Sequence, residues 1–133
     1  MLQGVTTTLQ QVQVALLRLI PAEAILIGHS LDCDLRALHL WHARCVDTAV
    51  IFPHPRGYPM RLKLRKLAED YLQQRIQCHG DKGHDSTEDA KAALQLALLK
   101  AAKGPLFGVR KPDLQRCALL GVLDEQTTAS LLV

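Results

Sequence analysis

The sequence predicts an α/β fold, because two short apolar runs alternate with segments that have helical periodicity. Residues 24–28 (AILIG) and 44–52 (RCVDTAVIF) have the composition of strands, and a helical segment lies between them. A strand, a helix and a second strand in this order form a βαβ unit, whose strands are normally parallel neighbours. With 133 residues, 48% of them hydrophobic and 22% charged, the chain has the size and composition of one globular domain.

The composition also excludes several classes of protein. Aromatic residues make up only 4% of the chain, which predicts an aliphatic core and counts against modules that stack bases on exposed aromatic rings. The four cysteines form no C-x-x-C pair, so we expect a reducing, intracellular environment rather than a disulfide framework. No apolar run is long enough for a transmembrane helix, so we expect no membrane partner.

The first expected elements are a helix over residues 9–20 and a strand over residues 24–28. Three threonines at positions 6–8 offer N-cap hydroxyls, and apolar residues then recur at helical spacing until Pro21 ends the helix. The run 24–28 is continuously apolar and ends in glycine. Such a run is typical of a strand that is buried on both faces.

A helix over residues 31–40 and a strand over residues 44–52 complete the predicted βαβ unit. Leu31, Leu35 and Leu38 lie on one side of the helix and Arg36 on the other. The strand is rich in β-branched residues. We interpret Trp41, at the end of the helix, as a packing residue.

Two more helices are expected further along the chain, over residues 62–72 and 86–103. Three prolines and a glycine between positions 53 and 59 mark the loop before the first of them, and the polar segment 78–84 (CHGDKGH) separates the two. The second helix has the stronger pattern. Its expected apolar face consists of Ala90, Ala93, Leu94, Ala97 and Leu98.

A two-stranded parallel sheet leaves both of its edges unpaired, although parallel sheets are normally buried between helices. Either the first residues or the tail supply further strands, or the chain is part of a larger sheet. We favour the larger sheet.

The first candidate site is the segment 28–38 (GHSLDCDLRAL), in which a buried strand ends and a helix begins. Asp34 lies in the first turn of that helix, beyond the carboxyl end of the strand, where ligands gather in open α/β sheets. A capping interpretation competes with this one. In it Ser30 or Asp32 is the N-cap and Asp34 complements the helix dipole, and the spacing alone favours this alternative.

The second candidate site is the segment 83–90 (GHDSTEDA), directly before the long helix. The pattern from Ser86 to Asp89 resembles a capping box, but capping does not explain His84. A histidine before the helix and an aspartate one turn into it can face the same cleft. Carboxylates suit Mg²⁺ or Mn²⁺, and a neutral imidazole can take a proton from a metal-bound water.

Three segments together carry a family resemblance: GHSLDCDLRAL, VDTAVIFPH and GHDSTEDAKAALQLALLK. They resemble the later part of a DEDDh 3′→5′ exonuclease domain, in particular the eukaryotic RNA exonucleases of the Rex type. The spacings H-x-x-x-x-D and G-H-S-x-x-x-D are specific in combination. The resemblance implies an RNase H-like exonuclease fold over residues 1–110 and leaves residues 111–133 as a C-terminal extension of unknown role.

The resemblance also implies the roles of three residues. Asp34 is implied as a ligand, direct or through water, of one divalent ion, Asp89 as the ligand of the other, and His84 as the general base. The complete domain is implied to bind two Mg²⁺ or Mn²⁺ ions, to act on single-stranded RNA 3′ ends and to lie in the nucleus. Cys33 departs from the family, which often has asparagine there, and Asp47 is expected to be structural.

The opening D-x-E motif of the family is absent, since Glu23 is the only acidic residue before Ala24. We therefore expect the chain to begin inside the domain, without the first strands of the sheet and without half of the metal-binding carboxylates. Two alternatives stay open. The chain is a catalytically dead fragment that binds RNA or a protein, or it has no stable fold alone.

A basic run extends from the loop into the helix at 62–72, and it has two interpretations. Its five members are Arg56, Arg61, Lys63, Arg65 and Lys66. It is either a solvated helix face or a patch that binds the phosphates of nucleic acid beside the acidic cleft. The net charge of +3 is too small to decide between them, and the sequence indicates no oligomeric state. The residues expected to contact nucleic acid are His29, Ser30, Arg61, Lys63 and Arg65.

Overall fold

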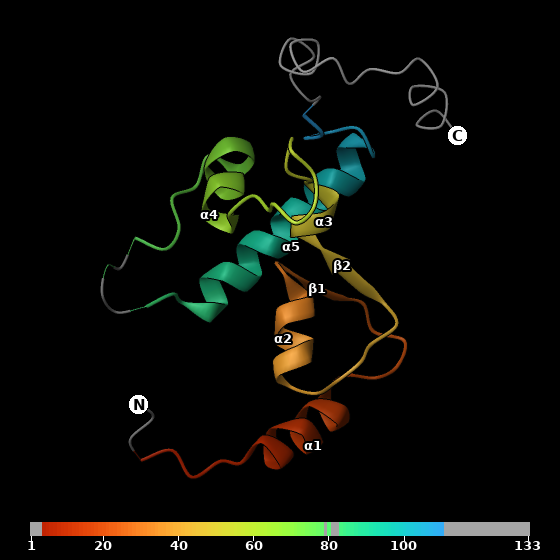
Figure 1. Cartoon of the computed structure of the whole chain (residues 1–133), viewed down its shortest axis with the longest axis vertical. Coiled ribbons are helices and arrows are strands. Elements are labelled where there is room, and N and C mark those ends of the chain that lie inside the picture. Colours follow the sequence, from red (N-terminus) through yellow and green to blue (C-terminus); the bar gives the residue numbers. More distant parts are fainter. Residues whose placement is uncertain (1–3, 79, 81–82, 111–133) are drawn as a thin grey trace.

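The computed structural model describes residues 4–78, 80 and 83–110, so the predicted extension at 111–133 lies outside the described residues. Along the chain the elements are α1 (Leu9–Leu19), β1 (Leu26–Gly28), α2 (Leu31–Ala37), β2 (Cys45–Asp47), α3 (Thr48–Ile51), α4 (Leu64–Leu67), the π-helical turn η1 (Ala68–Leu72) and α5 (Ser86–Lys103) (Figure 1). Over these residues, every helix is too short or too polar to cross a bilayer.

Strands β1 and β2 are parallel neighbours, as the βαβ pattern predicts. Gly28 lies opposite Asp47, at the carboxyl ends of both strands. The expected burial of β1 on both faces is wrong, because its residues are only half-buried and the preceding Ile25 is 59% exposed. Helix α5 contacts both strands, whereas neither α1 nor α2 contains a buried residue.

The core lies between α5 and the segment α4–η1, rather than on the sheet. In Figure 1, α5 crosses the molecule with α4 on one side and the strands on the other. The expectation of a purely aliphatic core is wrong in one respect, since the fully buried Phe52 stacks on Tyr71 with 5.1 Å between ring centroids. The buried cluster consists of Phe52, Leu64, Leu67, Ala68, Ile76, Ala92, Ala93 and Leu96.

Helix α5 has the predicted bounds but not the predicted details. Asp85, rather than Ser86, is the N-cap, and its carboxylate accepts hydrogen bonds from the backbone N–H groups of Thr87 and Glu88. Leu94 and Leu98 of the expected apolar face are 44% and 60% exposed. The position of α4 and η1 selects a different buried stripe, which consists of Ala92, Ala93, Leu96 and Ala97.

The other predicted elements are confirmed with shorter bounds. Thr8 and Gln11 form a capping box that starts α1, which ends before Pro21 as expected. The strand predicted over 44–52 stops at Asp47, because the carboxylate of that residue accepts the N–H of Ala49 and starts α3. The predicted helix 31–40 stops at Ala37, and Trp41, expected to be a packing residue, is 84% exposed.

Candidate active site

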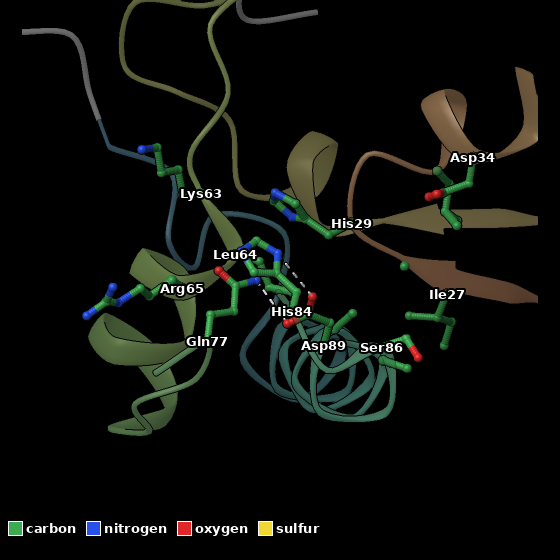
Figure 2. A pocket seen from close by; sticks show the side chains of 14 residues that line it. Ile27, His29, Asp34, Lys63, Leu64, Arg65, Gln77, His84, Ser86 and Asp89 are labelled. Atoms are coloured by element: carbon green, nitrogen blue, oxygen red, sulfur yellow. Dashed lines mark hydrogen bonds and ion pairs between the residues drawn. The ribbon is translucent and has the colours of Figure 1, made fainter. Parts of the chain in front are cut away.

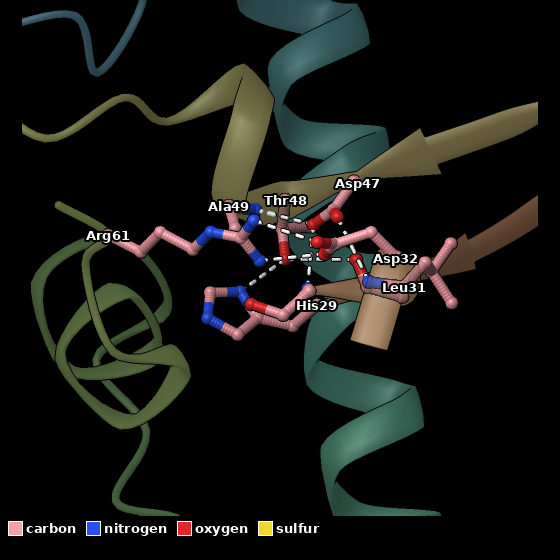
Figure 3. A network of polar contacts seen from close by, with 9 residues as sticks. His29, Leu31, Asp32, Asp47, Thr48, Ala49 and Arg61 are labelled. Carbon is pink, nitrogen blue, oxygen red and sulfur yellow. Dashed lines mark hydrogen bonds and ion pairs between the residues drawn. The ribbon is translucent and has the colours of Figure 1, made fainter. Parts of the chain in front are cut away.

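Asp47 organises the carboxyl ends of the two strands. Its carboxylate accepts hydrogen bonds from the backbone N–H groups of Ser30 (2.8 Å), Leu31 (3.0 Å) and Ala49 (2.9 Å) (Figure 3). It therefore caps the start of α2 from the neighbouring strand as well as the start of α3. Of the two predicted N-cap candidates, Ser30 is the N-cap residue of α2 and Asp32 is not, but the side chain of Ser30 makes no capping bond. The capping acceptor is the carboxylate of Asp47, which is structural as expected.

His29 projects from the end of β1 and is held by a buried threonine. Nδ1 of His29 lies 2.8 Å from Oγ1 of Thr48, and the Thr48 hydroxyl donates to the carbonyl oxygen of Gly28. Burial lowers the pKa of His29, and the nearby carboxylate of Asp47 opposes this shift. The imidazole is therefore neutral at neutral pH and offers a polar contact without charge.

Arg61 and Asp32 form an ion pair with two hydrogen bonds, of 2.7 and 2.9 Å. The guanidinium lowers the pKa of Asp32 to about 2, and the carboxylate raises the pKa of Arg61. Arg61 is expected to contact nucleic acid, but its guanidinium is committed to Asp32 in this structure. The pair also ties the loop before α4 to the first turn of α2.

A pocket of about 800 Å³ opens beside these contacts (Figure 2). The structure brings Asp34, His84 and Asp89 to its wall, although they are far apart in the sequence. Ser30 and Arg61 contribute to the neighbouring network of Figure 3 instead. The other lining residues are Ile27, Gly28, His29, Leu31, Lys63, Leu64, Arg65, Gln77, Ser86, Ala90 and Ala93.

Asp89 lies between two polar partners within the pocket. Its Oδ1 accepts a hydrogen bond of 2.9 Å from Nε2 of Gln77, and its Oδ2 lies 3.8 Å from Nδ1 of His84. Figure 2 shows both side chains directed at the Asp89 carboxylate. The sequence does not single out Gln77, because this residue belongs to no periodic pattern and lies just before the polar segment 78–84.

Lys63 and Arg65 supply positive charge near the acidic residues of the pocket. Both residues are exposed and lie at the start of α4. In Figure 2 the ammonium of Lys63 and the guanidinium of Arg65 point away from Asp89. Their charges therefore lie at the rim, where they can attract a polyanion without neutralising the carboxylates.

The two carboxylates that line the pocket are donors of the kind that Mg²⁺ and Mn²⁺ prefer. Asp34 is exposed and Asp89 is half-buried, so both oxygen donors are accessible. Over residues 4–78, 80 and 83–110, however, no three His, Cys, Asp or Glu side chains group closely enough to enclose an ion. Asp34 and Asp89 therefore fit part of the ligand set of a divalent ion, but they do not form a complete ligand set.

Comparison with known sequences shows extensive similarity to proteins named exonucleases, several of them RNA exonucleases. The chain is 57% identical over 93 residues to a protein named putative exonuclease GOR of Homo sapiens, a match that covers 70% of this chain and 14% of that protein. It is 45% identical over 106 residues to RNA exonuclease 1 of Saccharomyces cerevisiae, which covers 80% of this chain and 19% of that protein. The chain thus spans less than a fifth of these relatives. No family model matches the chain.

The fold is similar to that of solved nuclease domains. The Pan2 catalytic unit of Neurospora crassa superposes with a TM-score of 0.60 and 28% identity, covering 75% of this chain and 17% of that one. The Saccharomyces cerevisiae Pan2 module, solved in complex with AAGGAA RNA, superposes with a TM-score of 0.57 and 30% identity over 72% of this chain and 15% of that one. In sequence and fold, the chain matches Rex-type RNA exonuclease domains, with an RNase H-like fold.

Proposed function

We propose that this chain contributes to the removal of nucleotides from the 3′ ends of single-stranded RNA by phosphodiester hydrolysis. The observation that carries the proposal is that Asp34, His84 and Asp89 line one pocket with positive charge at its rim. The similarity to proteins named RNA exonucleases supports the same substrate class. By the same family resemblance we propose a nuclear location, which a fluorescent fusion protein would test.

Each pocket residue has a proposed role in that hydrolysis. The imidazole of His84 takes a proton from the attacking water, and Asp89, 3.8 Å from Nδ1, orients the ring. The oxygen of that water bonds to phosphorus, the bond from phosphorus to the 3′ oxygen breaks, and the 3′ oxygen takes up a proton. The products are a nucleoside 5′-monophosphate and an RNA shortened by one nucleotide.

Asp34 and Asp89 are the residues that would hold divalent ions, two Mg²⁺ or Mn²⁺ in the proposal. When bound, such ions polarise the water and neutralise the charge that develops on the phosphate. The chain's own residues bind and orient the RNA end. Lys63 and Arg65 attract its phosphates, and the neutral His29 offers a hydrogen bond within the pocket.

The test is a ribonuclease assay on 5′-labelled single-stranded RNA, with Mg²⁺ or with EDTA. We expect shortening from the 3′ end that EDTA abolishes, and a loss of about a hundredfold or more in His84→Ala and Asp89→Ala, the range typical of a lost general base. The control His39→Gln alters an exposed histidine and should retain full activity. Undiminished turnover in both pocket variants would overturn the residue assignment.

RNA binding without turnover would favour the alternative of a catalytically dead binding fragment. A fluorescence anisotropy titration with labelled RNA measures this binding separately from turnover. Binding that weakens with salt, and that is lost when Lys63 and Arg65 are both replaced by glutamine, would identify the rim as a phosphate-binding surface.

A further inference from the structure

Gln77 lines the pocket with an unusual backbone conformation. Its φ angle is +58°, in the left-handed region that residues other than glycine and asparagine seldom adopt. Such a conformation is unfavourable and persists only where the surrounding structure holds it. The contacts of Gln77 therefore indicate which interactions offset the unfavourable backbone conformation.

Two hydrogen bonds hold Gln77 against the first turn of α5. Its backbone N–H donates to Oε2 of Glu88 at 3.0 Å, and its side-chain Nε2 donates to Oδ1 of Asp89 at 2.9 Å. The preceding residue, Ile76, is only 3% exposed and belongs to the core. The backbone and the side chain of Gln77 are thus fixed to two consecutive residues of the helix.

The chemistry of the amide suits this contact. An ionised carboxylate only accepts hydrogen bonds, so the NH₂ end of the amide must face Asp89. Because the amide is neutral, it holds Oδ1 without cancelling the charge of the carboxylate, as a lysine or arginine would. The other oxygen, Oδ2, is left to face His84.

We propose that Gln77 is a positioning residue that fixes the orientation of the Asp89 carboxylate and so determines which of its oxygens faces His84 and the pocket. The proposal rests on the proposed function, in which Asp89 and His84 act together on the RNA end. Gln77 itself need not touch the substrate for this role.

The variant that isolates the side chain is Gln77→Gly, because glycine adopts positive φ without strain. Gln73 provides a matched control, since it is also a glutamine at positive φ (+55°) but is exposed at the end of η1. We expect both Gln77→Gly and Gln73→Gly to keep the Tm of the wild-type chain. Only Gln77→Gly should lower kcat, by about tenfold or more with KM for RNA unchanged, as expected for a misplaced catalytic group.

A double variant connects this effect to Asp89. In the background of Asp89→Asn, Gln77→Gly should cause no further loss, because the group that it positions is already altered. Wild-type turnover in Gln77→Gly, together with impaired turnover in Asp89→Ala, would overturn the positioning role and leave the proposed function intact. Full turnover in both Asp89→Ala and His84→Ala would count against the proposed function instead.

An NMR measurement on the 133-residue chain tests the contact independently of activity. The side-chain amide signals of Gln77 should shift when Asp89 is changed to asparagine. They should stay in place in Asp34→Asn, which alters another carboxylate of the same pocket. Signals of Gln77 that do not respond to Asp89→Asn would refute the positioning role.

Discussion

Arg61 and Lys63 are near neighbours in one basic run, but the structure gives them different chemistry. The guanidinium of Arg61 makes two hydrogen bonds to Asp32, whereas the ammonium of Lys63 lies at the pocket rim. The first residue therefore holds the loop in place, and the second is available to a ligand. A count of positive charges in the sequence cannot separate these two roles.

The Asp32–Arg61 pair makes a prediction about pH. Because the pKa of Asp32 is lowered to about 2 in the folded chain, its contribution to stability is present above the ordinary range for aspartate and is lost as the pH falls through about 2. NMR titration should show that low pKa directly. In Arg61→Gln the pKa of Asp32 should rise toward its ordinary value.

Arg56→Gln serves as the control for this titration, because Arg56 is another exposed arginine of the same basic run. It should leave the pKa of Asp32 near 2. An Asp32 carboxyl that titrates in the ordinary range in the wild-type chain would contradict the pairing seen in Figure 3.

Helices α2 and α3 and the two strands meet at a single carboxylate, that of Asp47. Asp85, by contrast, caps only α5, through the N–H groups of Thr87 and Glu88. Asp47 accepts from three N–H groups that belong to two different segments. It therefore joins the elements that place His29 and Asp34, besides ending β2.

Loss of this carboxylate should weaken the fold. A lost N-cap costs about 0.5–2 kcal/mol, and we expect Asp47→Ala to exceed that range because it leaves three part-buried N–H groups without their acceptor. Asp85→Ala removes an exposed cap, and its loss of unfolding free energy should stay within that range. Urea unfolding of both variants measures the difference, and an equal or smaller effect in Asp47→Ala would contradict the joining role.

The molecule as a whole is built around α5, which contacts the strands, α3, α4 and η1. Its buried leucine, Leu96, is completely inaccessible, whereas Leu98, two positions along, is 60% exposed. The two residues have the same chemistry in the same helix. They differ only in whether the rest of the molecule covers them.

This pair gives a matched test of where the core lies. Leu96→Ala should lower the free energy of unfolding by about 2–5 kcal/mol, the usual cost of truncating a core leucine. Leu98→Ala should change it by less than about 0.5 kcal/mol, as is usual for surface positions. Thermal or urea unfolding measures both values, and a larger effect at Leu98 would place the core on the face that the sequence predicts.

Local signals in the sequence were sufficient for some of these features and not for others. Helix α1 begins at the capping box of Thr8 and ends before Pro21, so neighbouring residues determine both of its ends. The long helix α5 keeps its predicted bounds. The buried stripe of α5 depends on α4 and η1, which local periodicity does not specify, so periodicity alone predicts the wrong face for Leu98. Family motifs pointed to Asp34, His84 and Asp89, but the contacts of Gln77 and Asp47 join distant positions and became visible only in the fold.

The location of the core has a consequence for the pocket. Asp89 stands on α5, which is anchored by four buried residues, whereas Asp34 stands on α2, which has none. Amide hydrogens of α2 should therefore exchange with deuterium sooner than those of α5, because local opening is easier where little apolar surface is buried. A ligand that engages both aspartates would slow exchange chiefly in α2, so that occupancy of the pocket could be detected from the less anchored helix.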